Sequence, residues 1–172
     1  MATSENGFGY QAKLPLSWQK VEQFSDVDLD RWMHANAVFL RALAVLETPL
    51  PEADKAMERL EAKVDLSLFL LTQLLSQHTP MPSPRPLSLN AQNMEWTDDQ
   101  SPEVESCVLA RLYLSPRLPQ PLILPLTVLS ISTMESGFRI HACLSHLSEE
   151  VQDWLERTLF RYHRRAIQQH VR

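Results

Sequence analysis

Two long heptad-spaced segments, separated by prolines at positions 49 and 51, limit the possible folds of this chain more than any other feature. Their mostly apolar residues recur at alternating steps of three and four, the spacing of the a and d positions of a coiled coil. These positions are Leu29, Trp32, Asn36, Phe39, Leu43 and Leu46 in the first segment, and Ala53, Met57, Leu60, Val64, Ser67, Leu71 and Leu74 in the second. We therefore expect two amphipathic helices that pack together along these rows.

The sequence also indicates where both helices end. Ser25 or Asp26 is a suitable N-cap for the first helix, which then runs to about Glu47. Pro49 and Pro51 end it, because a proline disfavours helical geometry in the preceding residue, and Pro51 suits the first turn of the next helix. At 1.5 Å per residue, a second helix that extends to the region of residue 77 would be roughly 39 Å long.

A helix of that length is longer than a small sheet, since a six-residue strand spans only about 20 Å. Its apolar row should extend beyond any sheet on which it packs, so we predict that the chain self-associates through both heptad rows. Asn36 and Ser67 are the polar members of these rows. Polar residues at such positions commonly set the register and the number of chains, and we expect the same here.

The remaining segments alternate apolar and polar residues, as half-buried strands require. They cover residues 13–21, 87–89, 94–96, 104–114, 121–134 and 137–146. Met134 to Gly137 has the length and the glycine of a hairpin loop, and Ser148 caps a last helix. These features predict an α+β fold, a small six-stranded antiparallel barrel with a C-terminal helix and an inserted helical hairpin.

This reading implies a single domain over residues 13–170, with the hairpin inserted at residues 26–78 and a disordered terminus at residues 1–12. The prolines at positions 80, 82, 84 and 86 are interpreted as a rigid return from the hairpin to the barrel. The alternative is a proline-rich ligand for a partner domain.

Composition excludes several classes of function. A net charge of −5 argues against nucleic-acid binding, which requires a basic surface. There is no apolar run of 18 residues and no secretory signal pattern, so we expect a cytoplasmic protein without membrane insertion. Cys107 and Cys143 are expected to be reduced thiols, as is usual in that compartment.

No group of residues in the sequence predicts an enzyme or a cofactor. Glycine occurs only at positions 7, 9 and 137, so a glycine-rich phosphate loop is absent. No serine lies in a nucleophile elbow. His141, Cys143 and His146 are the nearest approach to a metal cluster, but strand alternation places His146 on the opposite face, so we expect no metal.

The strand-rich part and the last helix resemble a PilZ domain. The resemblance is carried by residues 118–124, 138–144 and 147–165, with the opening strand Leu14 to Trp18. It implies a six-stranded barrel with a closing helix that reads the second messenger cyclic di-GMP. The hairpin inserted before the second half resembles the atypical, tetramer-forming branch, which implies a homotetramer.

The ligand motifs of that family are degenerate in this chain. The family has an Arg-x-x-x-Arg motif ahead of the barrel, whose guanidinium groups hold the phosphates, but no arginine precedes Lys13. The second motif, Asp or Asn, x, Ser, x, x, Gly, corresponds to Ser88, Asn90 and Asn93, and all three fixed positions differ. Asn93 could adopt the left-handed conformation of the glycine.

Three arginines of the last helix, Arg161, Arg164 and Arg165, remain as possible contacts for an anion or a partner. Our first hypothesis is a non-enzymatic, oligomeric adaptor that acts through an unknown signalling protein and does not bind cyclic di-GMP itself. The rival is a cyclic di-GMP receptor in which these arginines supply the charge. A third possibility, a helix-mediated partner module unrelated to PilZ, requires that the strands form no barrel.

Overall fold

The computed structural model describes residues 9–48, 55–78, 80–116 and 118–170. The elements are β1 (Tyr10–Val21), α1 (Asp26–Glu47), α2 (Lys55–His78), β2 (Pro84–Leu89), β3 (Asn93–Asp98), β4 (Cys107–Leu112), β5 (Leu122–Met134), β6 (Gly137–Cys143) and α3 (Glu149–His170). The predicted α+β class is confirmed, and two helices are inserted between the first two strands. Pro49 and Pro51, which we expected to separate the helices, lie outside the described residues.

The strands form a closed antiparallel barrel in the order β1-β2-β3-β6-β5-β4, which confirms the six-stranded prediction. The two long strands, β1 and β5, close the barrel because each pairs with two different neighbours along its length. The first half of β1 pairs with β2 and the second half with β4. Similarly, β5 pairs with β4 over Leu122 to Thr127 and with β6 over Thr127 to Met134. Such switching gives each short strand two neighbours and leaves no long unpaired edge.

Several predicted boundaries need correction. β1 begins at Tyr10, so the disordered terminus predicted for residues 1–12 is wrong for Tyr10 to Ala12, which pair with Leu87 to Leu89 of β2. Residues 1–8 lie outside the described part of the chain. The β5–β6 hairpin is confirmed, with Met134 opposite Gly137. Gly137 has a φ of +112°, and a Cβ there would lie 2.4 Å from the Asp98 carbonyl oxygen.

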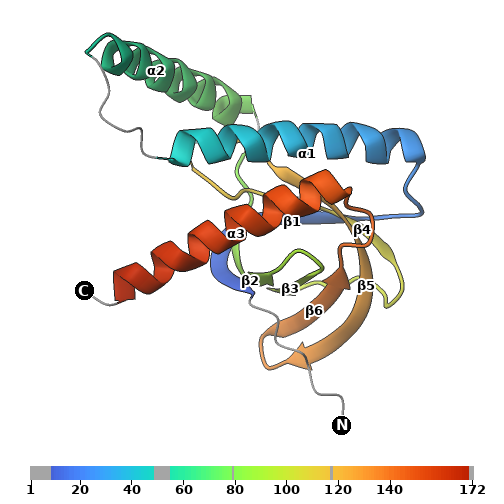
Figure 1. The fold of residues 1–172 in the computed structure, drawn as a ribbon. Coiled ribbons are helices and arrows are strands. Elements are labelled where there is room, and N and C mark those ends of the chain that lie inside the picture. Colours follow the sequence, from blue (N-terminus) through green and yellow to red (C-terminus); the bar gives the residue numbers. More distant parts are fainter. Residues whose placement is uncertain (1–8, 49–54, 79, 117, 171–172) are drawn as a thin grey trace.

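The core fills the barrel and continues into a layer of two helices. Leu16, Trp96, Leu124 and Ile140 are among its fully buried members. In Figure 1, α3 crosses the barrel and α1 lies beside α3, while α2 lies outside this layer. α1 packs against α3 and β5, and α3 also contacts β1. α1 and α3 therefore cover the side of the barrel that β5 and β1 form.

The predicted packing of α1 against α2 is not found within the described chain. The broad face of α1 that holds Met33, Asn36, Phe39, Leu40 and Leu43 is buried in the core, in contact with the barrel and α3. No described helix or strand packs extensively against α2. Heptad spacing identifies an apolar face of a helix but not its partner, and for α1 the partner is the barrel.

Asn36 explains how α1 is fixed to the barrel. Its side-chain amide donates to the carbonyl oxygen of Ile123 (2.7 Å) and its side-chain oxygen accepts from the Ile123 N–H (2.9 Å). Ile123 lies in the part of β5 that has β4 on one side and no pairing with β6 on the other. Asn36 thus takes the place of a neighbouring strand, so the predicted role in oligomer register is wrong for this residue.

Candidate functional site

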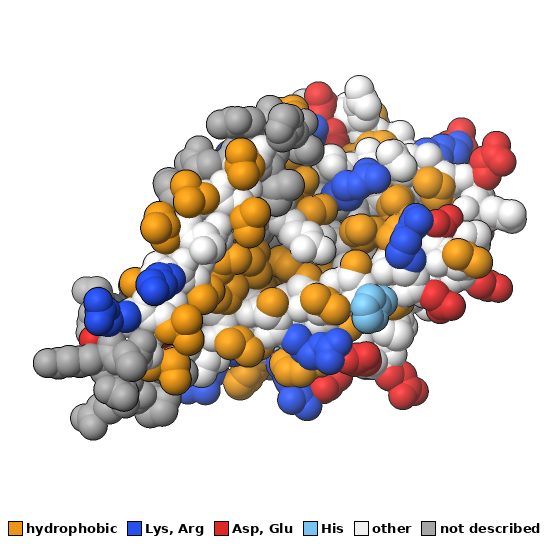
Figure 2. Space-filling model, turned by 90° about the horizontal axis from the view of Figure 1, so that it is seen from above, with side chains coloured by type: hydrophobic (Ala, Val, Ile, Leu, Met, Phe, Trp, Pro, Cys, Tyr) orange, Lys and Arg blue, Asp and Glu red, His pale blue; other side chains and the backbone are white. Residues whose placement is uncertain are grey.

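The most exposed apolar surface of the described chain lies on α2. We call Met57, Leu60, Val64, Leu71 and Leu74 the α2 stripe; their side chains are between 45 and 56 % exposed. Figure 2 shows hydrophobic side chains gathered on the face of the molecule that carries α1 and α2. Soluble proteins rarely leave a contiguous apolar row of this length in water, so the stripe indicates an interaction surface.

A second apolar row on α2 widens this surface. Leu66 and Leu70 are 58 and 53 % exposed and are one helical turn apart. Ser67, the polar member of the predicted seam, is exposed and donates its hydroxyl to the Lys63 carbonyl oxygen (2.8 Å). Because apolar side chains surround much of its circumference, α2 can bury them only by contacting more than one other helix.

The predicted interface residues of α1 do not lie on that surface as a group. Asn36, Phe39 and Leu43 are at most 3 % exposed within the single chain, so they cannot contact a second chain. Leu29, Trp32 and Leu46 are partly buried. The predicted interface residues of the two helices are therefore in different environments, and the described ones on α2 are exposed.

The arginines of α3 are engaged by Glu47, the last residue of α1. Arg165 contacts the Glu47 carboxylate (3.3 Å) and donates to the Glu47 carbonyl oxygen (2.8 Å). Arg161 lies 4.0 Å from the same carboxylate and also donates to the Thr158 hydroxyl (3.3 Å). Arg161 and Arg165 thus fasten α1 to α3, and contact of these arginines with an anion or a partner stays a prediction.

Tyr162 completes this contact by donating its hydroxyl to Glu47 (2.8 Å). Burial raises the pKa of Tyr162 well above its usual range, and the hydrogen bond and negative charge of Glu47 raise it further. Tyr10 packs on Tyr162 with its ring centroid 5.4 Å away. Burial, followed by the charge of Glu47, also raises the pKa of Tyr10. The two helices and the start of β1 are thus joined at one point.

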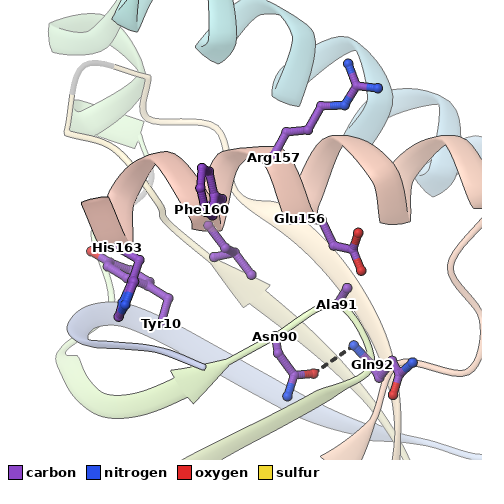
Figure 3. A pocket seen from close by; sticks show the side chains of 9 residues that line it. Tyr10, Asn90, Ala91, Gln92, Glu156, Arg157, Phe160 and His163 are labelled. Atoms are coloured by element: carbon purple, nitrogen blue, oxygen red, sulfur yellow. Dashed lines mark hydrogen bonds between the residues drawn. The ribbon is translucent and has the colours of Figure 1, made fainter. Parts of the chain in front are cut away.

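A cavity of about 640 Å³ lies between α3 and the turn that joins β2 to β3. Figure 3 shows side chains from β1, this turn and α3 around it. Its apolar wall and rim are formed by Tyr10, Ala91, Leu159 and Phe160. Ala91 and Leu159 are buried, whereas Phe160 is 62 % exposed. These residues were missed in the sequence because they come from three separate segments, although an exposed phenylalanine on a polar helix face was a possible signal.

The degenerate motif residues lie in and around this turn. Asn90 accepts hydrogen bonds from the backbone N–H groups of Gln92 (2.8 Å) and Asn93 (2.7 Å), so its side chain stabilises the turn and lines the cavity. Glu105 is the one non-glycine residue with positive φ in the described ranges. Asn93, which could have adopted the left-handed conformation of the glycine, instead begins β3 as an ordinary strand residue.

Ser88 does not share this cavity. It lines a separate, shallower hollow of about 430 Å³ on the outer face of the barrel, together with Lys13 and Arg139. Arg139 lies 3.7 Å from Glu95, which also lines the hollow. The positive charge of this hollow is thus partly neutralised.

Charged and titratable side chains of α3 line the larger cavity. In Figure 3, Glu156 points toward the turn that carries Ala91, whereas Arg157 points away from it. Arg157 pairs with Asp153 (2.9 Å) and its guanidinium lies over the Trp154 ring (5.5 Å to the centroid). A ligand would therefore meet the Glu156 carboxylate on this side of the cavity, while His163 lines the other side and Arg164 lies over the Phe160 ring at the rim.

The histidine and cysteine residues that were considered in the sequence do not form a common site in the described ranges. His146 packs against the ring of Phe24 at a centroid distance of 5.0 Å, and no group of three metal-ligating side chains occurs in the described ranges. Cys107 and Cys143 are free thiols, each opposite Thr127 from the two flanking strands. Among the described helices, none has the length and apolar character needed to cross a membrane.

The fold and the cavity define a small barrel domain with a binding surface beside its C-terminal helix. Residues 40–172 match a family described as "Atypical PilZ domain, cyclic di-GMP receptor". Since this match covers more than half of the chain, the protein belongs to the atypical PilZ family, as the resemblance in its sequence predicted.

One solved structure is similar over almost the whole length. It is a pathogenic protein from Xanthomonas campestris, described as a tetrameric PilZ domain self-assembled via a helical bundle. The TM-score is 0.78 and the sequence identity 24 %, with 95 % of this chain and 92 % of that chain covered. A comparison with curated proteins found no match.

Proposed function

We propose that this chain is a protein-interaction adaptor in cyclic di-GMP-related signalling, that it assembles through α2, and that it does not bind the nucleotide itself. The observation that carries the proposal is the α2 stripe, five apolar side chains about half exposed and at heptad spacing. Covering each half-exposed side chain would contribute on the order of 1 kcal/mol. Covering the stripe therefore provides a driving force for association through α2.

The two apolar rows of α2 require more than one partner helix. A helix with one apolar row can be covered by a single partner, whereas Leu66 and Leu70 need a second one. A bundle of four α2 helices meets this requirement, and the similar Xanthomonas campestris protein is described as a tetramer assembled via a helical bundle. We infer a homotetramer in which the barrels lie outside the bundle.

The absence of nucleotide binding is supported by the charges of the site. The chain has no arginine before its first strand, and Arg161 and Arg165 are held by Glu47. At the cavity beside the degenerate motif, Glu156 is directed inward and Arg157 outward. Two phosphates would lack the paired guanidinium groups that bind them strongly in a receptor.

Assembly is tested by light scattering coupled to size-exclusion chromatography. The double variant Leu60→Glu/Leu71→Glu introduces two charges into the α2 stripe and should convert a discrete oligomer into single chains with an unchanged circular dichroism spectrum. The matched control is Val27→Glu, an equally apolar residue that is 78 % exposed on the first turn of α1. A wild-type chain that is monomeric, or an oligomer that survives the double substitution, contradicts the assembly mechanism.

A second candidate function is a cyclic di-GMP receptor with non-standard contacts. It is favoured by the family description and by the open cavity at the β2–β3 turn. Arg164 is the best-placed cation, since it is exposed and lies 5.9 Å from the centroid of Phe160, which lines the cavity. Calorimetry decides between the two functions: we expect no binding at micromolar concentration, and micromolar binding abolished by Arg164→Ala would establish the receptor.

A further inference from the structure

The cavity beside α3 is preformed and largely apolar, which suits it to a protein side chain. Leu159 and Ala91 are both 6 % exposed and are held in the packed structure. The Tyr10 ring is supported from behind by Tyr162, and Asn90 is fixed by its two hydrogen bonds to the turn. Binding to such a cavity does not require the walls to be ordered first, so little conformational entropy is lost there.

Glu156 gives the cavity a negative charge that the described structure does not compensate. No hydrogen bond or ion pair joins it to another described residue, although Arg157 follows it directly in the helix. Of the other titratable side chains that line the cavity, Arg157 points away from it and pairs with Asp153 (2.9 Å), and His163 lies at the opposite end, beside Tyr10. The Phe160 ring already has the Arg164 guanidinium 5.9 Å from its centroid, so a cation that entered would interact with the Glu156 carboxylate at the other end of the cavity.

We propose that this cavity is a docking site for a segment of a partner protein that presents a large apolar side chain next to a lysine or arginine. The apolar side chain would occupy the space between Leu159 and Ala91, and the cation would pair with Glu156. The inference rests on the proposed adaptor function and names the chemistry of its partner. It also requires a charge preference opposite to that of a nucleotide receptor.

The test uses two fluorescein-labelled tetrapeptides with amidated C-termini, Gly-Leu-Arg-Gly and Gly-Leu-Glu-Gly, and fluorescence anisotropy with the full chain. An exposed ion pair contributes up to about 1 kcal/mol, so the arginine peptide should bind about threefold to fivefold more tightly. In Glu156→Lys the preference should reverse. Phe160→Ala should weaken binding of both peptides, since it removes part of the apolar rim.

The control variant is Glu135→Lys, which makes the same change of charge on the exposed β5–β6 turn and should keep the preference for arginine. Equal binding of the two peptides, no binding at millimolar peptide concentration, an unchanged preference in Glu156→Lys, or displacement of the arginine peptide by cyclic di-GMP overturns the inference. Light scattering on the same samples separates the two proposals. An intact oligomer without peptide preference refutes the docking site alone, whereas a monomer with the preference refutes only assembly.

Discussion

Replacing Asn36 with leucine separates two roles that the sequence pattern leaves open for this residue. At a coiled-coil seam, the leucine would strengthen the helix contact and blur the number of chains. In the structure Asn36 is 1 % exposed and both ends of its amide are bonded to the backbone of Ile123. Leucine fills a similar volume but can form neither bond, so the Ile123 N–H and carbonyl groups would lose their partners.

The expected magnitude follows from those two groups. A buried donor or acceptor left without a partner costs about 1–3 kcal/mol, so losing both bonds costs about 2–6 kcal/mol. The extra apolar surface of leucine returns about 1 kcal/mol, and partial access of water to the edge of β5 removes the upper part of the range. We expect Asn36→Leu to lower the free energy of unfolding by about 1–4 kcal/mol.

Urea unfolding followed by tryptophan fluorescence measures this change. Association stabilises the folded state in a concentration-dependent way, so the measurement is made at several chain concentrations and in the Leu60→Glu/Leu71→Glu background. Ser67→Leu is the matched control, because it makes a similar polar-to-leucine change at an exposed position of α2. It should leave the stability of the barrel unchanged. An Asn36→Leu protein as stable as the wild type would refute the role assigned to the Ile123 bonds.

Two further predictions concern the helix contact and the β5–β6 turn. Burial and Glu47 raise the pKa of Tyr162 in the folded protein, whereas an unfolded tyrosine ionises near pH 10. The free energy of unfolding should therefore fall as the pH rises above about 10. Denaturation at a series of pH values should show a smaller fall for Tyr162→Phe, and an identical fall would exclude Tyr162 as its source. Gly137→Ala should lower the free energy of unfolding by about 2 kcal/mol or more, because φ is +112° and the new Cβ would lie 2.4 Å from the Asp98 carbonyl oxygen. Thermal unfolding measures this change, with Ser136→Ala on the same exposed turn as the control. Equal melting temperatures for the two variants would contradict the steric argument.

The local periodicities of the chain were sufficient to predict the fold class. The heptad rows, the alternating segments and the turn at Gly137 depend on contacts between residues a few positions apart, which a single sequence displays directly. The missing arginines ahead of the barrel were equally visible. The sequence by itself therefore determined the barrel and the inserted helices, and it predicted that the usual phosphate clamp is lacking.

Only the tertiary structure decided what each of these faces contacts. An apolar row on a helix looks the same whether a second helix or a barrel covers it, and α1 turned out to pack on the barrel while α2 stayed exposed. The Asn36–Ile123 and Arg165–Glu47 contacts join residues 87 and 118 positions apart, so no local pattern records them. The charge of the cavity likewise depends on the direction in which Glu156 and Arg157 leave α3, and that direction is set by how the helix packs.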